Sequence, residues 1–178
     1  MYIYVDWDDD NPSAELDIQG EQYERLIDIC FHHCSYFSLN ENRSGVMFDL
    51  PEKELEVWLE QLSSPIRKKH LFFCSYEAKQ YLLRKVNSLF SWITWGTHNR
   101  DIKEGILPED LCFYRSDGSV FLWSETHEGI CVICSKPEED VSDIVSSEGW
   151  REVFDGDYFG VPVHLEEYNL FGNCRYFL

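Results

Sequence analysis

The sequence has 178 residues, which fits a single domain of ordinary size. Hydrophobic residues make up 44% of it, and Phe, Trp and Tyr together 16%, which excludes an intrinsically disordered chain. The 33 Asp and Glu against 15 Lys and Arg give a formal net charge of −18. Because such an excess repels phosphate groups, we expect no direct binding to nucleic acid or to anionic membranes, and instead a basic protein as partner.

The first ten residues and the seven cysteines predict a cytoplasmic protein. The stretch from Met1 to Asp10 has neither the basic nor the apolar run of a signal peptide. Without export, the thiols are expected to stay reduced. No apolar run approaches the roughly 20 residues that a membrane-spanning helix needs.

The first half of the chain predicts strands and helices in alternation. Residues 2–7 alternate as a strand whose buried face carries Ile3, Val5 and Trp7. From Glu21 the spacing becomes helical, with a stripe of Tyr23, Leu26, Ile27, Cys30, Phe31 and Cys34. A polar connector over 40–45 and a short strand over 46–50 follow.

A second helix is predicted after Pro51, from the spacing of Leu55, Trp58, Leu59 and Leu62. Its other face would be acidic, with Glu52, Glu54, Glu56 and Glu60. A short buried strand over 71–74 comes next. Ser75 is expected to cap a third, longer helix that ends at Gly96, and its stripe is Ala78, Tyr81, Leu82, Val86, Leu89, Phe90 and Ile93.

The second half predicts an antiparallel meander near 111–134. Two apolar runs, 111–115 and 120–123, flank a turn with Asp117-Gly118, and a third strand follows over 130–134. Ser135 and Glu138 match a capping box for a short helix that buries Val141, Ile144 and Val145. The tail from Trp150 predicts one or two closing strands. Together these elements predict a single α+β domain over 1–178, with a mostly antiparallel sheet packed against three to four helices.

Three groups of residues could carry chemistry. Cys30, His33 and Cys34 are candidate metal ligands that Cys74 or Cys174 would complete, but core packing explains the cysteines without any metal and is favoured. His127 beside Glu128 could act as a general base, or could simply sit exposed in a turn. Cys131 and Cys134 form a Cys-x-x-Cys, but on a strand their sulfurs would point to opposite faces, as core residues do. We expect no cofactor and no metal.

The hairpin region 109–129, read from Glu109-Asp110-Leu111-Cys112-Phe113 through Thr126-His127-Glu128-Gly129, resembles a strand–turn–strand of small acidic bacterial proteins, including immunity-type proteins of toxin loci. That resemblance covers about 20 residues and contains no catalytic signature. It implies a protein that presents an acidic surface to a basic toxin, often a nuclease.

The sequence therefore favours an acidic binding or inhibitor protein over an enzyme. The residues expected to bind the partner are exposed by pattern: Asp8, Asp9, Asp10, Glu52, Glu56 and Glu60. The alternative is a small hydrolase or metal-dependent enzyme that uses His127 and Glu128, or Cys30, His33 and Cys34. A DNA mimic, with carboxylates in rows at phosphate-like spacing, is a third possibility.

Overall fold

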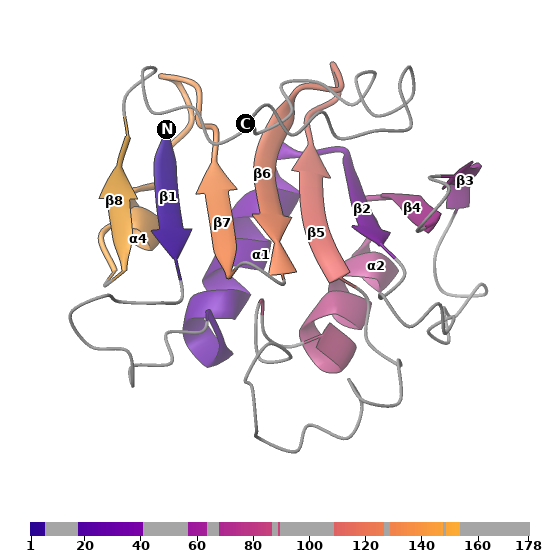
Figure 1. Ribbon diagram of the computed structural model, residues 1–178, viewed down its shortest axis with the longest axis horizontal. Coiled ribbons are helices and arrows are strands. Elements are labelled where there is room, and N and C mark those ends of the chain that lie inside the picture. Colours follow the sequence, from indigo (N-terminus) through magenta and orange to yellow (C-terminus); the bar gives the residue numbers. More distant parts are fainter. Residues whose placement is uncertain are drawn as a thin grey trace.

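An eight-stranded antiparallel sheet with strand order β3-β4-β2-β5-β6-β7-β1-β8 forms the centre of the computed structural model (Figure 1). The structure describes residues 1–5, 18–40, 57–63, 68–86, 89, 109–126, 129–147 and 149–153. Its strands are β1 (Tyr2–Val5), β2 (Tyr36–Asn40), β3 (Val57–Ser63), β4 (Lys68–Phe73), β5 (Glu109–Tyr114), β6 (Val120–Glu125), β7 (Ile130–Ile133) and β8 (Trp150–Glu152). The predicted α+β fold on an antiparallel sheet is confirmed.

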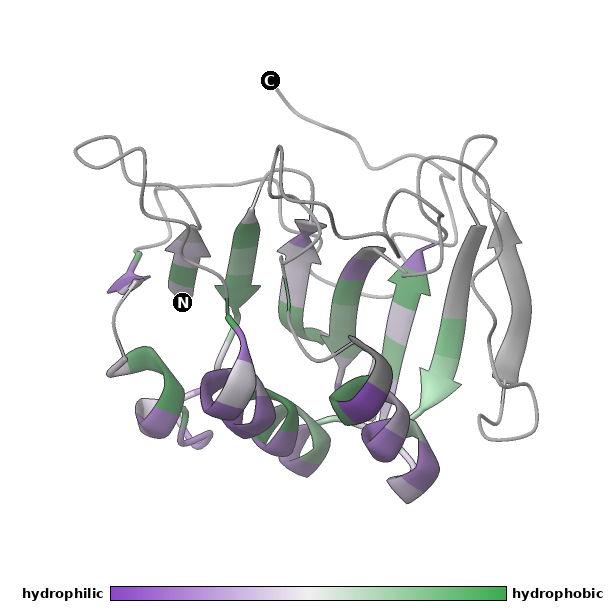
Figure 2. Cartoon of the chain, turned by 90° about the horizontal axis from the view of Figure 1, so that it is seen from below, coloured by the Kyte–Doolittle hydropathy of each residue, from purple (hydrophilic) through white to green (hydrophobic). Residues whose placement is uncertain are grey.

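The described helices all pack on one face of this sheet. They are α1 (Gly20–His33), α2 (Tyr76–Tyr81) with a following turn of π-helix, η1 (Leu82–Val86), and the short α4 (Ser142–Val145). Figure 2 shows their hydrophilic residues pointing outward and their hydrophobic residues toward the strands. The helix predicted from Glu21 is confirmed as α1, because its apolar stripe buries Tyr23, Leu26, Ile27 and Cys30 against the sheet.

Two further local predictions are confirmed by hydrogen bonds. The Ser75 hydroxyl accepts a bond of 3.1 Å from the Ala78 N–H and so caps α2. In the β5–β6 hairpin, the Arg115 N–H donates to the Ser119 carbonyl at 2.9 Å, and the Gly118 N–H to the Arg115 carbonyl at 2.9 Å. Gly118 has a φ of 82°, a left-handed conformation that glycine adopts without strain.

The helix predicted after Pro51 is wrong where the structure describes it. Residues 57–63 form strand β3, which pairs antiparallel with β4 through two register shifts. Spacing of i, i+3, i+4 and i+7 also occurs in strands that are interrupted by bulges, because a bulge changes which face the following residues occupy. The predicted strand over 46–50 and most of the predicted third helix beyond Val86 lie outside the described residues.

The predicted capping box is also wrong. The short helix α4 begins at Ser142, and its N-cap is Val141. Instead of Glu138, it is Glu139 that folds back, and its carboxylate accepts a bond of 2.6 Å from the Lys136 N–H. Val141 and Ile144 are buried as predicted, and Val145 is half-buried. The tail was expected to close the sheet, and β8 does so beside β1.

Both faces of the sheet are apolar. One cluster of buried residues lies between the sheet and the helices, and includes Tyr4, Phe37, Phe113 and Ile133. The second lies on the other face. The first strand shows the consequence: Ile3 and Tyr4 point to opposite faces, yet both are buried. The sequence predicted that only one face of this strand is buried, whereas residues on both of its faces are.

Candidate functional site

Of the residues expected to bind a partner, Glu60 alone belongs to the part of the chain that the structure describes. Glu60 lies on the edge strand β3, while Asp8, Asp9 and Asp10, which follow β1 in sequence, lie outside the described residues, as do Glu52 and Glu56. Since β3 is six strand spacings from β1, these two strands are roughly 30 Å apart at about 4.8 Å per spacing. Because residues 57–63 are a strand, Glu52, Glu56 and Glu60 also do not share the face of one helix.

Of the candidate metal ligands, Cys30, Cys34 and Cys74 lie near enough to one another in the core to interact electrostatically. Among the described residues, no group of three or more His, Cys, Asp or Glu side chains could hold a metal ion. Cys30 and Cys34 are buried in the helix-side core, whereas the His33 ring lies against Phe121, with centroids 5.3 Å apart. Cys174 is outside the described part of the chain.

The thiols on this side are placed as core residues. Burial raises the pKa of Cys30, Cys34 and Cys131, and it raises the pKa of Cys74 to about 12. A raised pKa keeps a thiol protonated and therefore weakly nucleophilic. Cys131 belongs to the helix-side cluster and Cys134 to the opposite one, so the two sulfurs of the Cys-x-x-Cys point to opposite faces, as expected.

The possible general base, His127 with Glu128, lies outside the described residues, but the chain around it is anchored by an Asp–Thr pair. The Asp110 N–H donates to the Thr126 hydroxyl at 2.8 Å, and the Thr126 N–H donates to the Asp110 carboxylate at 2.9 Å. The other carboxylate oxygen of Asp110 accepts a bond of 2.8 Å from the Asn40 amide. This cluster ties the start of β5 to the ends of β2 and β6.

Asp110 adopts a φ of 53°, the one positive value at a non-glycine residue in the described part of the chain. Asp tolerates this left-handed conformation better than most residues, because its short side chain can bond locally. The reciprocal bonds with Thr126 hold it there. Both carboxylate oxygens are occupied by these contacts, so the group works as a structural clamp.

Arg115 forms a second polar cluster at the opposite end of the sheet. Its guanidinium donates two bonds of 2.6 Å to the two carboxylate oxygens of Glu139. It also donates to the Val120 carbonyl at 2.6 Å, the Cys134 carbonyl at 2.6 Å and the Ser119 hydroxyl at 3.2 Å. Both charged side chains are only 8% exposed.

These contacts use all five N–H donors of Arg115, so none is free for a ligand. Burial on its own would lower the pKa of Arg115, but the bonds and the negative charge of Glu139 outweigh it and raise the pKa. Burial likewise would raise the pKa of Glu139, but the Arg115 and Lys136 bonds outweigh it and lower the pKa. The pair holds the 134–139 segment against the β5–β6 hairpin.

One feature of the sequence points to this cluster. Arg115 is a single cation that ends an apolar run immediately before a turn, a position where a buried charge needs a partner. Glu139 lies in an acidic stretch of the sequence, Glu138-Glu139-Asp140, where nothing local marks it as the partner of Arg115.

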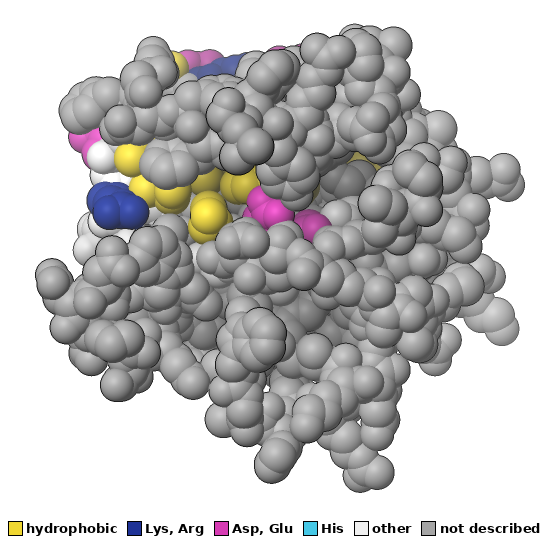
Figure 3. All heavy atoms as spheres, in the orientation of Figure 1, with side chains coloured by type: hydrophobic (Ala, Val, Ile, Leu, Met, Phe, Trp, Pro, Cys, Tyr) yellow, Lys and Arg dark blue, Asp and Glu magenta, His cyan; other side chains and the backbone are white. Residues whose placement is uncertain are grey.

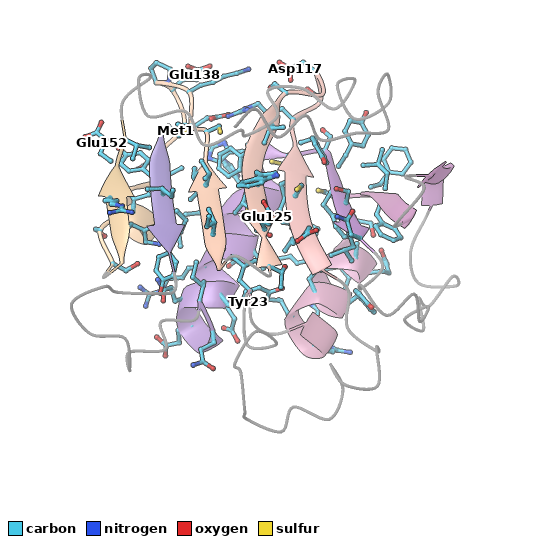
Figure 4. All side chains as sticks on the ribbon, in the orientation of Figure 1. Met1, Tyr23, Asp117, Glu125, Glu138 and Glu152 are labelled. Carbon is cyan, nitrogen blue, oxygen red and sulfur yellow. The ribbon has the colours of Figure 1, made fainter. Side chains whose placement is uncertain are left out.

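Exposed carboxylates remain at both ends of the molecule. Figure 4 places Asp117 and Glu138 together at the end that carries the β5–β6 turn, far from Tyr23 of α1. Bonds from the Ser119 hydroxyl and N–H lower the pKa of Asp117, and bonds from Ser142 lower the pKa of Asp140. On the helix layer, the exposed carboxylates are those of Glu21, Glu24, Asp28, Glu77 and Asp143. Three of these carboxylates pair with cations of the same chain: Glu21 with Arg25 at 3.3 Å, Asp28 with Lys79 at 2.8 Å and Asp117 with Lys136 at 3.2 Å.

The second face of the sheet, opposite the helices, also carries a cluster of buried hydrophobic residues. Figure 3 looks onto it and shows hydrophobic side chains over β8, β1 and β7, with acidic side chains beside them. The buried residues on this face are Ile3, Leu71, Cys112, Tyr114, Val120, Trp123, Val132 and Val153. The Ser38 and Tyr114 hydroxyls share a hydrogen bond of 3.0 Å there.

Comparisons with known proteins add no assignment: no family model, no curated protein and no solved structure matches the chain. Within the described residues, none of the helices has the length and apolar character needed to cross a membrane.

Proposed function

We propose that this chain is an acidic binding protein that docks a basic protein, with inhibition of a toxin or nuclease by an immunity-type protein as its specific form. The observation that carries the proposal is the formal net charge of −18. A field of this sign speeds the encounter with a positively charged partner and disfavours other acidic surfaces. The resemblance of the 109–129 hairpin to immunity-type proteins supports the specific form.

The distribution of polar groups in the described residues agrees with binding. Arg115, Glu139 and Asp110, whose charged groups are largely buried, are bonded to other parts of the same chain. The carboxylates that face solvent, such as Glu24 and Asp143, are the ones free to meet a partner electrostatically. Five thiols have raised pKa values and are therefore poor nucleophiles: those of Cys30, Cys34, Cys74, Cys131 and Cys134.

The proposed contact residues remain Asp8, Asp9 and Asp10 together with Glu52, Glu56 and Glu60. A partner that contacts both β3, which carries Glu60, and β1, which precedes Asp8 in the sequence, must span roughly 30 Å. That distance is about the width of a standard interface, which buries roughly 800 Å² on each partner. One broad interface can therefore contact both strands, whereas a small peptide cannot.

The test begins with affinity capture at low salt and mass spectrometry, followed by Kd measurements on the purified pair over a salt series. We expect a basic protein whose affinity weakens steeply as salt rises, and whose enzymatic activity is titrated at one to one. Replacing Asp8, Asp9 and Asp10 with Asn, or Glu52, Glu56 and Glu60 with Gln, should raise Kd at least tenfold.

The matched control removes the same amount of charge from α1, by changing Glu21 and Glu24 to Gln and Asp28 to Asn. If the control raises Kd as much as either test variant, only overall charge matters and the proposed contact residues are wrong. A partner bound with a Kd that does not change with salt would refute the electrostatic mechanism.

A further inference from the structure

Two thiols that are far apart in the sequence lie close together where α1 ends and α2 begins. Cys34 is the C-cap of α1, and its N–H donates to the Cys30 carbonyl at 2.9 Å. Cys74 follows the last residue of β4 and precedes Ser75, the cap of α2. The side chains of Cys34 and Cys74 both pack in the cluster between the sheet and the helices, so they lie on the same face of the sheet.

The backbone around the two cysteines sets their separation. The Cys74 N–H donates to the Ser35 carbonyl at 2.9 Å, which continues the antiparallel register in which Tyr36 lies opposite Phe73. Residues opposite each other in a hydrogen-bonded pair have Cα atoms about 5.5 Å apart, and the next residue along a strand lies about 3.4 Å further on. The Cα atoms of Cys34 and Cys74 are therefore roughly 6.5 Å apart, within the range of about 4.4–6.8 Å that a disulfide needs.

Both cysteines are free thiols, and one of them can be reached from solvent. Cys74 is half-buried, whereas Cys34 is only 8% exposed and Cys30 is fully buried. A small neutral oxidant such as hydrogen peroxide therefore reaches Cys74 first. Burial raises the pKa of Cys74 to about 12, so little thiolate is present at neutral pH and its oxidation becomes faster as the pH rises.

We propose that Cys34 and Cys74 form a disulfide when the protein is exposed to a peroxide, and that this bond ties the end of α1 to the start of α2. Hydrogen peroxide oxidises the Cys74 thiol to a sulfenic acid and is itself reduced to water. The Cys34 sulfur then attacks the Cys74 sulfur, so that the S–S bond forms and the S–O bond breaks. The hydroxyl group leaves with the Cys34 proton as a second water, and a thiol reductant reverses the reaction.

The bond would join two elements that the fold already holds side by side. Asp28 of α1 and Lys79 of α2 form an ion pair at 2.8 Å. The Lys79 ammonium also lies 5.9 Å from the centre of the Phe31 ring of α1. Because these contacts fix the two helices before oxidation, the bond adds little strain to the folded state. It also closes the chain between residues 34 and 74 into a loop, which removes conformations from the unfolded chain and so stabilises the fold.

The test is oxidation of the full chain with hydrogen peroxide at mildly alkaline pH, followed by alkylation, trypsin digestion and tandem mass spectrometry. Cys74 is the one cysteine of tryptic peptide 70–79, and Cys30 and Cys34 share peptide 26–43. We expect these two peptides to be linked, with fragment ions that assign the bond to Cys34, and the link to disappear with dithiothreitol. A link assigned to Cys30, or oxidised Cys74 without any linked peptide, would overturn the proposal.

Two matched variants check the assignment. We expect the link to persist in Cys30→Ala and to be lost in Cys34→Ala, where dimedone traps the Cys74 sulfenic acid instead. An equal yield of linked peptides in the two variants would contradict the assignment to Cys34.

The melting temperature of the wild type tests whether the bond fits the folded state. We expect oxidation to raise it by about 5 °C, and dithiothreitol to restore the original value. Oxidised Cys34→Ala is the control and should show no rise. An unchanged or lower melting temperature in wild-type protein that carries the bond would show that the bond strains the fold, and would refute the stabilising link between α1 and α2.

Discussion

The ion pair between Arg115 and Glu139 offers the sharpest test of how this fold is held together. Changing Glu139 to Gln keeps the shape of the side chain but leaves the guanidinium charge buried and without a counter-charge. Because both side chains are only 8% exposed, solvent cannot replace the lost carboxylate. Removing one partner of a buried pair typically lowers the free energy of unfolding by about 3–5 kcal/mol. That is a large share of the roughly 5–15 kcal/mol that a domain has in total.

The double variant Arg115→Met with Glu139→Gln separates charge pairing from hydrogen bonding. The double variant removes the buried charge, so its decrease in the free energy of unfolding should be smaller than the sum of the decreases in the two single variants. It still leaves the Val120 and Cys134 carbonyls without their donor, at about 1–3 kcal/mol for each buried group that stays unpaired. We therefore expect a coupling energy of a few kcal/mol between the two positions.

The assay is urea denaturation followed by circular dichroism, with the four members of the cycle compared at pH 7. The control is Glu21→Gln, which breaks the exposed ion pair with Arg25 at 3.3 Å and should change stability by less than about 1 kcal/mol. A decrease in the free energy of unfolding below about 1 kcal/mol for Glu139→Gln, or strictly additive single effects, would refute the view that this buried ion pair stabilises the fold.

Three further predictions follow from single contacts. Because the folded-state pKa of Glu139 is lowered, the stability that this residue contributes is present above its unfolded pKa of about 4.5 and is lost as the pH falls below that value. The free energy of unfolding of the wild type should therefore fall more steeply from pH 5 to pH 3 than that of Glu139→Gln. An equal decrease in the two proteins would contradict this. Ser75→Ala should lower the free energy of unfolding by about 0.5–2 kcal/mol through loss of the α2 cap, while Ser75→Asp, which can still cap the helix, should retain most of the wild-type stability. An equal decrease in stability for both variants would show that the cap is unimportant. Gly149→Ala should destabilise the protein measurably in thermal melts, since its φ is 94° and a new Cβ would overlap the Tyr4 ring. An unchanged melting temperature would show that β8 can move away from β1.

The elements that the sequence predicted well are those whose signal is local. The stripe of α1 and the Asp117-Gly118 turn of the hairpin depend on residues within a few positions of each other, and both are found where expected. The Ser75 cap is similarly local, because its acceptor and donor are three residues apart.

The elements that the sequence did not predict depend on distant partners. Strand β2, from Tyr36 to Asn40, was missed because it directly follows the end of α1 and its identity comes from pairing with β4 and β5. Strand β3 was taken for a helix because Leu55, Trp58, Leu59 and Leu62 have helical spacing, whereas pairing with β4 decides its conformation.

The polar clusters were unpredictable for the same reason. Arg115 and Glu139 are 24 residues apart, and Asn40 and Asp110 are 70 residues apart, so only the folded chain shows that they meet. The acidic composition was visible from the start, but composition does not place charges in space. The separation of β3 from β1 by six strand spacings is information that only the sheet order supplies.

The position of β1 in the sheet has a consequence for the order of folding events. Tyr2 pairs with Ile133 on one side and with Glu152 on the other, so the strand made early in synthesis lies between two strands made much later. While the ribosome extends the chain, Tyr2–Val5 has no partner strand and exposes its apolar side chains and backbone. Loops of this length close slowly, because their entropy must be lost before any contact is gained. We therefore expect docking of this strand to be a late, rate-limiting step of folding. Until then, a chaperone that binds short extended apolar segments can bind the strand.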